Sequence, residues 1–284
     1  MEPLYEQQLA LLETIVSYRK SWLDPLFLGL NYIDSFWGYL MIILVSWLKM
    51  GKLRGFHLFC LYLTIYCVVF FLKTSFQLPR PPEHLWMAEP SLSTFPSGGA
   101  ANLMVLFGFL ITQCKRPIYQ FLLAFTIFLN AFSRLYLGVH FPIDVLSGLL
   151  IGLVVLILYF QSIDAILTIT HKIPPFMNFL TGALLLFLLY FNFPKTTQLE
   201  MFYFLAIGVF SGMAARSYLP LPFAEKKTNA VITCFLFLVF ALFYHILPQT
   251  EFPLILPFLF VIGITVPLIA PWFSNHLLYP KNTL

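Results

Sequence analysis

Three short polar segments, each at the end of a long apolar run, hold most of the side chains that could carry chemistry. They cover residues 73–81, 95–99 and 133–144. Cations and hydrogen-bond donors stabilise the charge of a phosphoryl group in transfer, and an imidazole can act as the nucleophile. The segments supply such groups as Lys73, Arg80, Ser97, Arg134, His140 and Asp144. The residue types therefore predict a site for a phosphate group.

The first segment contributes two cations. Arg80 suits bidentate contact with phosphate, whereas Lys73 acts as a point charge. Prolines at positions 79, 81 and 82 stiffen the loop around Arg80. The alternative is that both long side chains only reach from a helix end to the membrane surface.

The second segment is expected to begin a helix. Ser97 is placed to cap it, and Gly98 and Gly99 leave its first N–H groups open to a close ligand. A helix N-terminus with bare backbone donors is a ready anion site. The alternative is an ordinary serine cap, followed by small residues that allow close helix packing.

The third segment pairs a histidine with an aspartate. Pro142 is expected in the first turn of a helix, with His140 just before it and Asp144 inside that turn. Asp144 can accept a proton from one imidazole nitrogen and so aim the other at phosphorus. The alternative is simple interfacial polarity, although ionisable groups at membrane depth are functional candidates by default.

Composition indicates an integral membrane protein. The chain has 284 residues, of which 60% are hydrophobic and 10% are charged, against about a quarter charged in a soluble domain. The net charge of +4 comes from scattered basic residues, so no nucleic-acid partner is expected. The four cysteines lie in or beside apolar runs and are interpreted as small buried hydrophobes, not as a disulfide framework or a metal set.

The apolar runs predict an all-α, polytopic helical bundle with about nine transmembrane helices. The expected spans are 26–48, 55–72, 98–113, 118–134, 142–161, 176–193, 201–219, 229–247 and 253–273. Asp34, near the motif end of the first span, is interpreted as an interfacial residue, with a role in shaping the site as the alternative. Before the spans, Tyr5, Leu9, Leu12 and Val16 recur at helical spacing, which fits either a helix on the membrane surface or a disordered tail.

Charge in the loops predicts an orientation. With nine spans, all three polar segments fall on one side of the membrane. Lysines and arginines outside these segments concentrate on the other side, and short loops rich in such residues stay in the cytoplasm. The candidate site is therefore expected to face the periplasm of a bacterial inner membrane.

Taken together, the three segments resemble the signature of the type 2 phosphatidic acid phosphatase (PAP2) superfamily, which reads K-x6-R-P, P-S-G-H and S-R-x5-H-x3-D. The resemblance implies a six-helix-type core over 26–161, after an interfacial segment at 1–25 and before additional helices of unknown role at 162–284. It implies that His140 forms a phosphohistidine and that Asp144 orients it. The implied phosphate-binding residues are Lys73, Arg80, Ser97, Gly98 and Arg134, and neither a metal nor another cofactor is implied.

The sequence departs from this signature at Gly99, where the family has the histidine that protonates the leaving group. General acid catalysis of this kind contributes typically 10²–10⁴-fold. Four interpretations stay open. The leaving group is itself a phosphate, as in a lipid diphosphate; His84 or Glu83 in the same loop supplies the proton; water supplies it in a slow enzyme; or the chain binds a phosphorylated lipid without hydrolysing it.

These observations predict a membrane-embedded, metal-independent phosphatase that acts on a lipid phosphate or lipid diphosphate, with no particular protein partner indicated. Two alternatives remain at this point. One is a phosphotransferase of the same fold that passes the phosphoryl group to an acceptor other than water. The other is a non-catalytic protein that binds or transports phosphorylated lipids.

Overall fold

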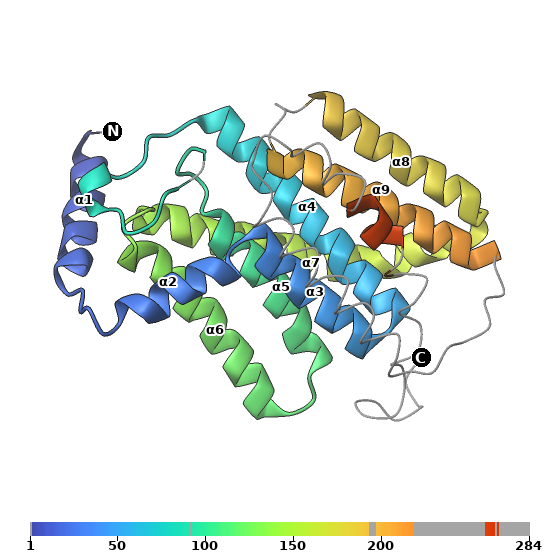
Figure 1. Ribbon diagram of the computed structural model, residues 1–284, viewed down its shortest axis with the longest axis horizontal. Helices are drawn as coiled ribbons and strands as arrows, with labels where there is room; N and C mark the ends of the chain where they lie inside the picture. The colour runs from blue at the N-terminus through green and yellow to red at the C-terminus, as the bar shows by residue number, and fades with distance from the viewer. Residues whose placement is uncertain (1, 91, 193–196, 219–258, 265, 267–284) are drawn as a thin grey trace. The chain divides into compact units, whose positions relative to one another are not determined.

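The computed structural model describes residues 2–90, 92–192, 197–218, 259–264 and 266, and within these ranges the regular secondary structure is entirely helical (Figure 1). The α-helices are α1 (Glu2–Ser17), α2 (Asp24–Ile33), α3 (Phe36–Met50), α4 (Lys52–Phe76), α5 (Gly98–Gln113), α6 (Pro117–Tyr136), α7 (Pro142–Lys172), α8 (Pro175–Asn192) and α9 (Thr197–Tyr218); a short 3-10 helix, η1, covers Glu83–Leu85. The predicted all-α class is confirmed over the described residues.

Among the described residues, three helices are long and apolar enough to cross a membrane, at Leu53–Phe76, Pro117–Tyr136 and Pro142–Ile169, and the bent pair α2–α3 makes a fourth if it counts as one span. Helices also occupy the expected spans at 98–113, 176–193 and 201–219, as α5, α8 and α9. The expected span at 229–247, and most of that at 253–273, lie outside the described residues. The chain is a multi-helix membrane protein, and the predicted count of nine is not confirmed.

The first expected span, 26–48, is not one continuous helix. Helices α2 and α3 are bent by 68° at a short break that contains Asp34 and Ser35. The Ser35 hydroxyl accepts a hydrogen bond from the Gly38 N–H (3.1 Å), which caps the start of α3. The Asp34 carboxylate is occupied by a distant arginine, described below. Both side chains thus favour a break that hydropathy alone cannot reveal.

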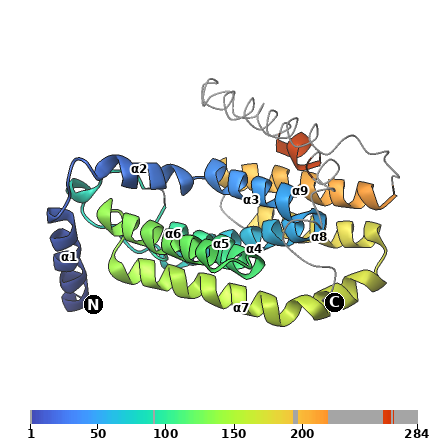
Figure 2. The same ribbon diagram turned by 90° about the horizontal axis from the view of Figure 1, so that it is seen from below.

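The chain forms two compact units, one from Met1–Ile42 and Leu58–Gln161, the other from Ile43–His57 and Ser162–Leu284. In the first unit α5 packs against α6, and the two lie side by side in both views (Figures 1 and 2); α6 also contacts α1 and α2. In the second unit α8 and α9 pack together. Here Gly212 of α9 approaches the backbone of Ile264 so closely that an added Cβ would lie 2.5 Å from the carbonyl oxygen.

Two glycines of α7 bring its backbone against α5. A Cβ on Gly148 would lie 2.4 Å from the Ser97 carbonyl oxygen, and one on Gly152 would lie 2.7 Å from the Ala101 oxygen. This small-residue spacing allows close helix contact in a membrane. It holds the start of α7 beside the start of α5, where the Ser97 N–H donates to the Asp144 carbonyl (3.0 Å).

The end of α6 is turned by Gly138, whose φ of +72° is the left-handed conformation that a glycine adopts after a helix. A Cβ there would also lie 2.1 Å from the Leu85 carbonyl oxygen. Glycine thus permits both the turn and the close approach of the η1 segment. The short connection that follows carries Val139 and His140 directly into α7.

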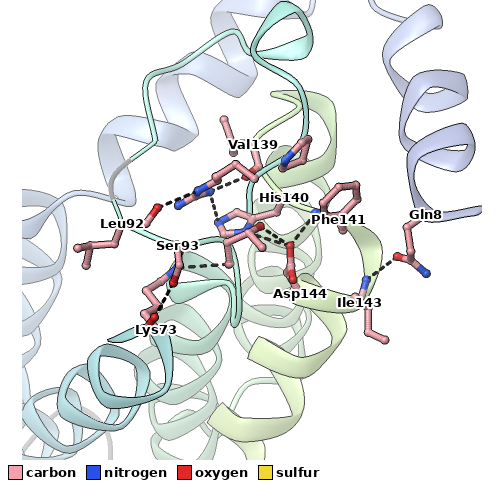
Figure 3. A network of polar contacts seen from close by, with 12 residues as sticks. Gln8, Lys73, Leu92, Ser93, Val139, His140, Phe141, Ile143 and Asp144 are labelled. Atoms are coloured by element: carbon pink, nitrogen blue, oxygen red, sulfur yellow. Dashed lines mark hydrogen bonds and ion pairs between the residues drawn. The ribbon is translucent and has the colours of Figure 1, made fainter. Parts of the chain in front are cut away.

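Residues 2–17 form a helix, as the spacing of apolar residues allowed, and not a disordered tail. Leu12 of this helix is fully buried with Leu85 and Phe141. The Gln8 side-chain oxygen accepts a hydrogen bond from the Ile143 N–H (3.1 Å), as Figure 3 shows. Helix α1 therefore packs directly on the segment that carries His140.

Candidate active site

The three polar segments meet at one end of the first unit. This end is formed by the last turns of α4 and α6 and the first turns of α5 and α7. Hydrogen bonds join the segments: the Lys73 ammonium donates to the carbonyl oxygens of Ser93 and Thr94, and Arg80 contacts His140. Figure 3 shows this network around His140 and Asp144. Residues far apart in the sequence thus form one polar cluster, as a single phosphate site requires.

Thr94 links His140 to Asp144. Its Oγ1 lies 3.3 Å from His140 Nδ1 and donates to Asp144 Oδ2 over 2.5 Å. The direct distance from Nδ1 to Oδ2 is 3.6 Å, beyond ordinary hydrogen-bond length. Because the threonine proton points to the carboxylate, its oxygen is left to accept from an Nδ1–H. Sequence reasoning missed Thr94, since nothing in its type or spacing marks it.

Arg80 fixes the other imidazole nitrogen. Its Nη1 lies 3.2 Å from His140 Nε2, and a guanidinium can only donate. Nε2 therefore carries no proton, which agrees with the Nδ1–H tautomer that the threonine contact favours. Burial, together with the nearby cations Arg80 and Lys73, lowers the pKa of His140 to about 3. The ring is neutral at physiological pH, with its lone pair on Nε2.

Asp144 is held as an acceptor at the start of α7. Its Oδ2 also takes a hydrogen bond from the Phe141 N–H (2.8 Å), and its side chain is almost fully buried. A buried carboxylate needs such donors to offset its lost hydration. The arrangement fixes the carboxylate that, through Thr94, orients the imidazole.

Lys73 and Arg80 are both anchored by backbone carbonyls. Lys73 is buried and its three donors are partly satisfied by the carbonyl oxygens of residues 93 and 94. Arg80 donates to the carbonyl oxygens of Leu92 and Val139. Burial lowers the pKa of the Arg80 guanidinium to about 10, so it stays charged at neutral pH. Two anchored basic side chains, one of them a charged guanidinium, thus lie beside the imidazole.

Ser97 is the residue before α5, as predicted, but its side chain does not cap the helix. Its hydroxyl is fully buried and has no hydrogen-bond partner in the structure. A buried hydroxyl without a partner costs free energy, which a bound oxyanion would recover. A Cβ on Gly98 would lie only 3.9 Å from Lys73 Cε. The open helix N-terminus therefore lies next to the lysine chain.

Arg134 is buried and donates hydrogen bonds to three neighbouring side chains. Its Nη1 donates to Asp34 Oδ2 (2.6 Å) and to Asn31 Oδ1 (2.9 Å), while its other nitrogens donate to the neighbouring serine hydroxyl of Ser133. Asp34 is thus not an interfacial side chain, which corrects the first interpretation made from its position. Its carboxylate is 9% exposed and pairs with a guanidinium that is 5% exposed.

Asp34 also explains why position 99 is a glycine. A Cβ on Gly99 would lie 2.0 Å from Asp34 Oδ2 and 2.5 Å from its Cγ. No real Cβ makes contacts this short, so the carboxyl group fills the space that a side chain at position 99 would enter. Asn130 fixes this turn from the other side, through a hydrogen bond from Nδ2 to the Gly99 carbonyl (3.2 Å).

His84, the sequence candidate for a substitute acid, is exposed on η1, as is Glu83. Among the described residues, no hydrogen bond or ion pair joins either side chain to the network around His140. The structure thus brings together the seven predicted residues of the catalytic pair and phosphate cradle and leaves His84 apart from their network; its role stays a prediction. The described residues hold no group of three or more histidine, cysteine or acidic side chains suited to a metal ion.

Three described helices that can cross a membrane, α4, α6 and α7, meet the shorter α5 at a buried histidine and basic side chains. These features define an integral membrane protein with a candidate phosphoryl-transfer site. Residues 54–167 match the family model described as the PAP2 superfamily. This match confirms the resemblance to that superfamily predicted from the three segments.

Two of the similar proteins are phosphatases by their names. A lipid A 4'-phosphatase of Bacteroides thetaiotaomicron is 40% identical over 58 residues, which make up 20% of this chain and 26% of that protein. The match therefore spans about a quarter of the relative's length. A PAP2-type phosphatidylglycerolphosphate phosphatase from Bacillus subtilis shares the fold, with a TM-score of 0.52 and 22% identity over 58% of this chain and 89% of that one. The structure of Aquifex aeolicus LpxE gives a TM-score of 0.49 and 28% identity over 54% and 94%.

Proposed function

We propose that the chain is a membrane-embedded phosphatase that removes phosphate from a lipid phosphate or lipid diphosphate through a phosphohistidine intermediate. The observation that carries the proposal is the state of His140. It is buried and neutral, its Nδ1–H is oriented through Thr94 towards Asp144, and its Nε2 lone pair faces a guanidinium. An arginine beside a nucleophile's lone pair is well placed to hold a phosphate oxygen in its stead.

The residues of the cluster would have separate roles in binding the phosphate and in transferring it. Arg80, Lys73 and the N-terminus of α5 would neutralise the phosphate oxygens, and the unpartnered Ser97 hydroxyl would donate to one of them. His140 Nε2 would attack phosphorus and displace the lipid. The positive charge that then develops on the ring is stabilised by Asp144 through the threonine hydroxyl. Water would hydrolyse the phosphohistidine in a second step.

The same reasoning extends to the setting of the reaction. The substrate would be a lipid whose headgroup lies at the membrane surface, and the positive-inside distribution of loop charges supports a site on the periplasmic face of a bacterial inner membrane. The Bacteroides relative and the Bacillus neighbour are named for lipid phosphate substrates, which supports a lipid substrate here.

The test is phosphate release by the purified protein in liposomes from a panel of lipid mono- and diphosphates, with EDTA present throughout. We expect release from at least one of them, and we expect His140→Ala to reduce it by about 10⁴-fold or more, as removal of a nucleophile does elsewhere. Glu89→Gln, an exposed change in the same loop, is the matched control. Phosphate release that survives in His140→Ala, or its absence with every lipid, would refute the proposal.

A further inference from the structure

Displacing an alcohol from phosphorus requires a proton for the departing oxygen, and the described network offers few groups that can give one. Lys73 and the arginines are needed as cations. Asp144 already accepts hydrogen bonds from Thr94 and Phe141 at one oxygen. The other buried carboxyl group of the cluster is Asp34, which sits against the first turn of α5 and beside Arg134.

The Asp34 carboxyl group occupies the space into which a side chain at position 99, in the first turn of α5, would project. Its carboxyl oxygens would lie within 2.0–2.7 Å of a Cβ at position 99, so glycine leaves this volume to the aspartate. Arg134 and Lys73 both interact electrostatically with Asp34, which places the carboxyl group among the charges of the phosphate cradle. The break between α2 and α3 delivers it there, where a continuous helix would keep it on a helical surface.

We infer that Asp34 is the general acid of the reaction, and that it gives its proton to the leaving oxygen of a lipid phosphate monoester. The inference rests on the proposed function and adds to it the acid that Gly99 cannot supply. It also favours an alcohol leaving group, because a departing phosphate would not need this proton.

The reaction takes two steps, and Asp34 regains in the second the proton that it gives in the first. In the first, the Nε2–P bond forms, the P–O bond to the lipid breaks, and the electron pair of that bond stays on the oxygen, which takes the proton of Asp34. The products are an alcohol, an Asp34 carboxylate and a phosphohistidine. In the second, that carboxylate takes a proton from the attacking water while the O–P bond forms and the N–P bond breaks. Phosphate leaves and the neutral imidazole and the protonated Asp34 are restored.

The ion pair with Arg134 determines whether Asp34 is a carboxylate or a protonated carboxyl group. Without substrate, Arg134 holds Asp34 as a carboxylate through Nη1. A phosphate dianion at the α5 N-terminus shares that guanidinium and places negative charge beside the carboxylate. Two like charges in a buried site cannot both persist, so one proton is taken up, and it resides on Asp34 when the reaction begins.

The test compares two lipids that differ in their leaving groups, phosphatidic acid and farnesyl diphosphate. Asp34→Asn keeps the shape and a hydrogen-bond acceptor for Arg134 but cannot give a proton. We expect it to slow hydrolysis of phosphatidic acid by roughly 10²–10⁴-fold, and hydrolysis of farnesyl diphosphate at least tenfold less than that. Asp24→Asn is the matched control. Asp24 begins α2, the helix that ends just before Asp34, and its carboxylate accepts a hydrogen bond from Tyr136 of α6; the change should affect both lipids alike.

A second pair of variants tests the inference if Asp34→Asn does not fold, as judged by elution and thermal unfolding in detergent. Asp34→Ala should lose phosphatidic acid hydrolysis, and Asp34→Ala with Gly99→His should regain at least tenfold, because an imidazole can enter the vacated volume. Equal losses with both lipids in Asp34→Asn, or no gain in the double variant, would overturn the role of Asp34. So would a wild type that hydrolyses farnesyl diphosphate alone. A wild type inert on both lipids and on the wider panel would instead refute the proposed function.

Discussion

Thr94 Oγ1 lies between the two residues of the predicted catalytic pair, 3.3 Å from His140 Nδ1 and 2.5 Å from Asp144 Oδ2. A hydroxyl in this position donates in one direction and accepts in the other, so it passes the influence of the carboxylate to the ring while keeping the two apart. The imidazole is oriented by a side chain of the α4–α5 loop as well as by the aspartate four residues further along.

Thr94→Val tests this link. Valine keeps the shape but removes the hydroxyl, which takes away the acceptor of the Nδ1–H and one of the two hydrogen-bond donors to Asp144 Oδ2. A hydrogen bond to a charged group is worth about 1.5–3 kcal/mol, so we expect kcat to fall by roughly tenfold to a hundredfold. Thr94→Ser, which keeps the hydroxyl, should retain most of the activity. Steady-state kinetics of both variants on one lipid substrate measure the difference, and equal activity of valine and serine variants would contradict it.

The pH dependence of kcat/KM follows from the buried state of His140. Only the neutral ring can attack, and burial lowers its pKa to about 3. Protonation of His140 should therefore not reduce kcat/KM between pH 5 and 7, where a solvated histidine, with a pKa near 6.5, would lose most of its nucleophilic form. Its acid limb should lie near pH 3. A kcat/KM profile measured in detergent checks this, and an acid limb near pH 6.5 that is the same for lipid mono- and diphosphates and is retained in Asp34→Asn would contradict it.

Replacement of Gly99 is expected to destabilise the protein. In Gly99→Ala the new Cβ would lie 2.0 Å from Asp34 Oδ2, and that carboxylate is anchored by Arg134. Forcing an extra group into a packed site costs typically 1–3 kcal/mol, which corresponds to a drop in Tm of roughly 2–10 °C. Gly98→Ala is the control, because its Cβ would meet Val69 at an ordinary 3.5 Å. Equal Tm values for the two variants would show that position 99 has free space.

The predicted orientation can be measured by labelling. In a background without native cysteines, Glu89→Cys lies in the loop of the candidate site and Arg116→Cys lies between α5 and α6, at the opposite end of these helices; both positions are exposed. A membrane-impermeant maleimide applied to whole spheroplasts should label the first variant and reach the second only after permeabilisation. The reverse pattern would place the site in the cytoplasm.

The sequence predicted the site to the extent that its chemistry is local or has a fixed spacing. His140 and Asp144 are four residues apart across the start of α7, and Lys73 and Arg80 lie at the end of an apolar run, so type and spacing suffice. Thr94 and Asp34 could not be found in this way. Thr94 is one polar residue in a loop, and the position of Asp34 depends on an arginine 100 residues later in the chain.

In the fold, too, the sequence predicts what depends on local pattern and misses what depends on tertiary contacts. Apolar length predicted α4, α6 and α7 because each is close to the thickness of a bilayer. It predicted a continuous first span wrongly, since hydropathy averages over the two side chains that break the helix at residues 34 and 35. Tertiary contacts decide such breaks, and these contacts are not visible in a hydropathy pattern.

The packing of α1 has a practical consequence for anyone handling this protein. Because Leu12 packs on Phe141 and Gln8 accepts a hydrogen bond from the Ile143 N–H, the amino-terminal helix supports the stretch that carries His140 and is not dispensable. Shortening it, or fusing a bulky tag close to it, would loosen the wall behind the imidazole even though no reactive atom is altered.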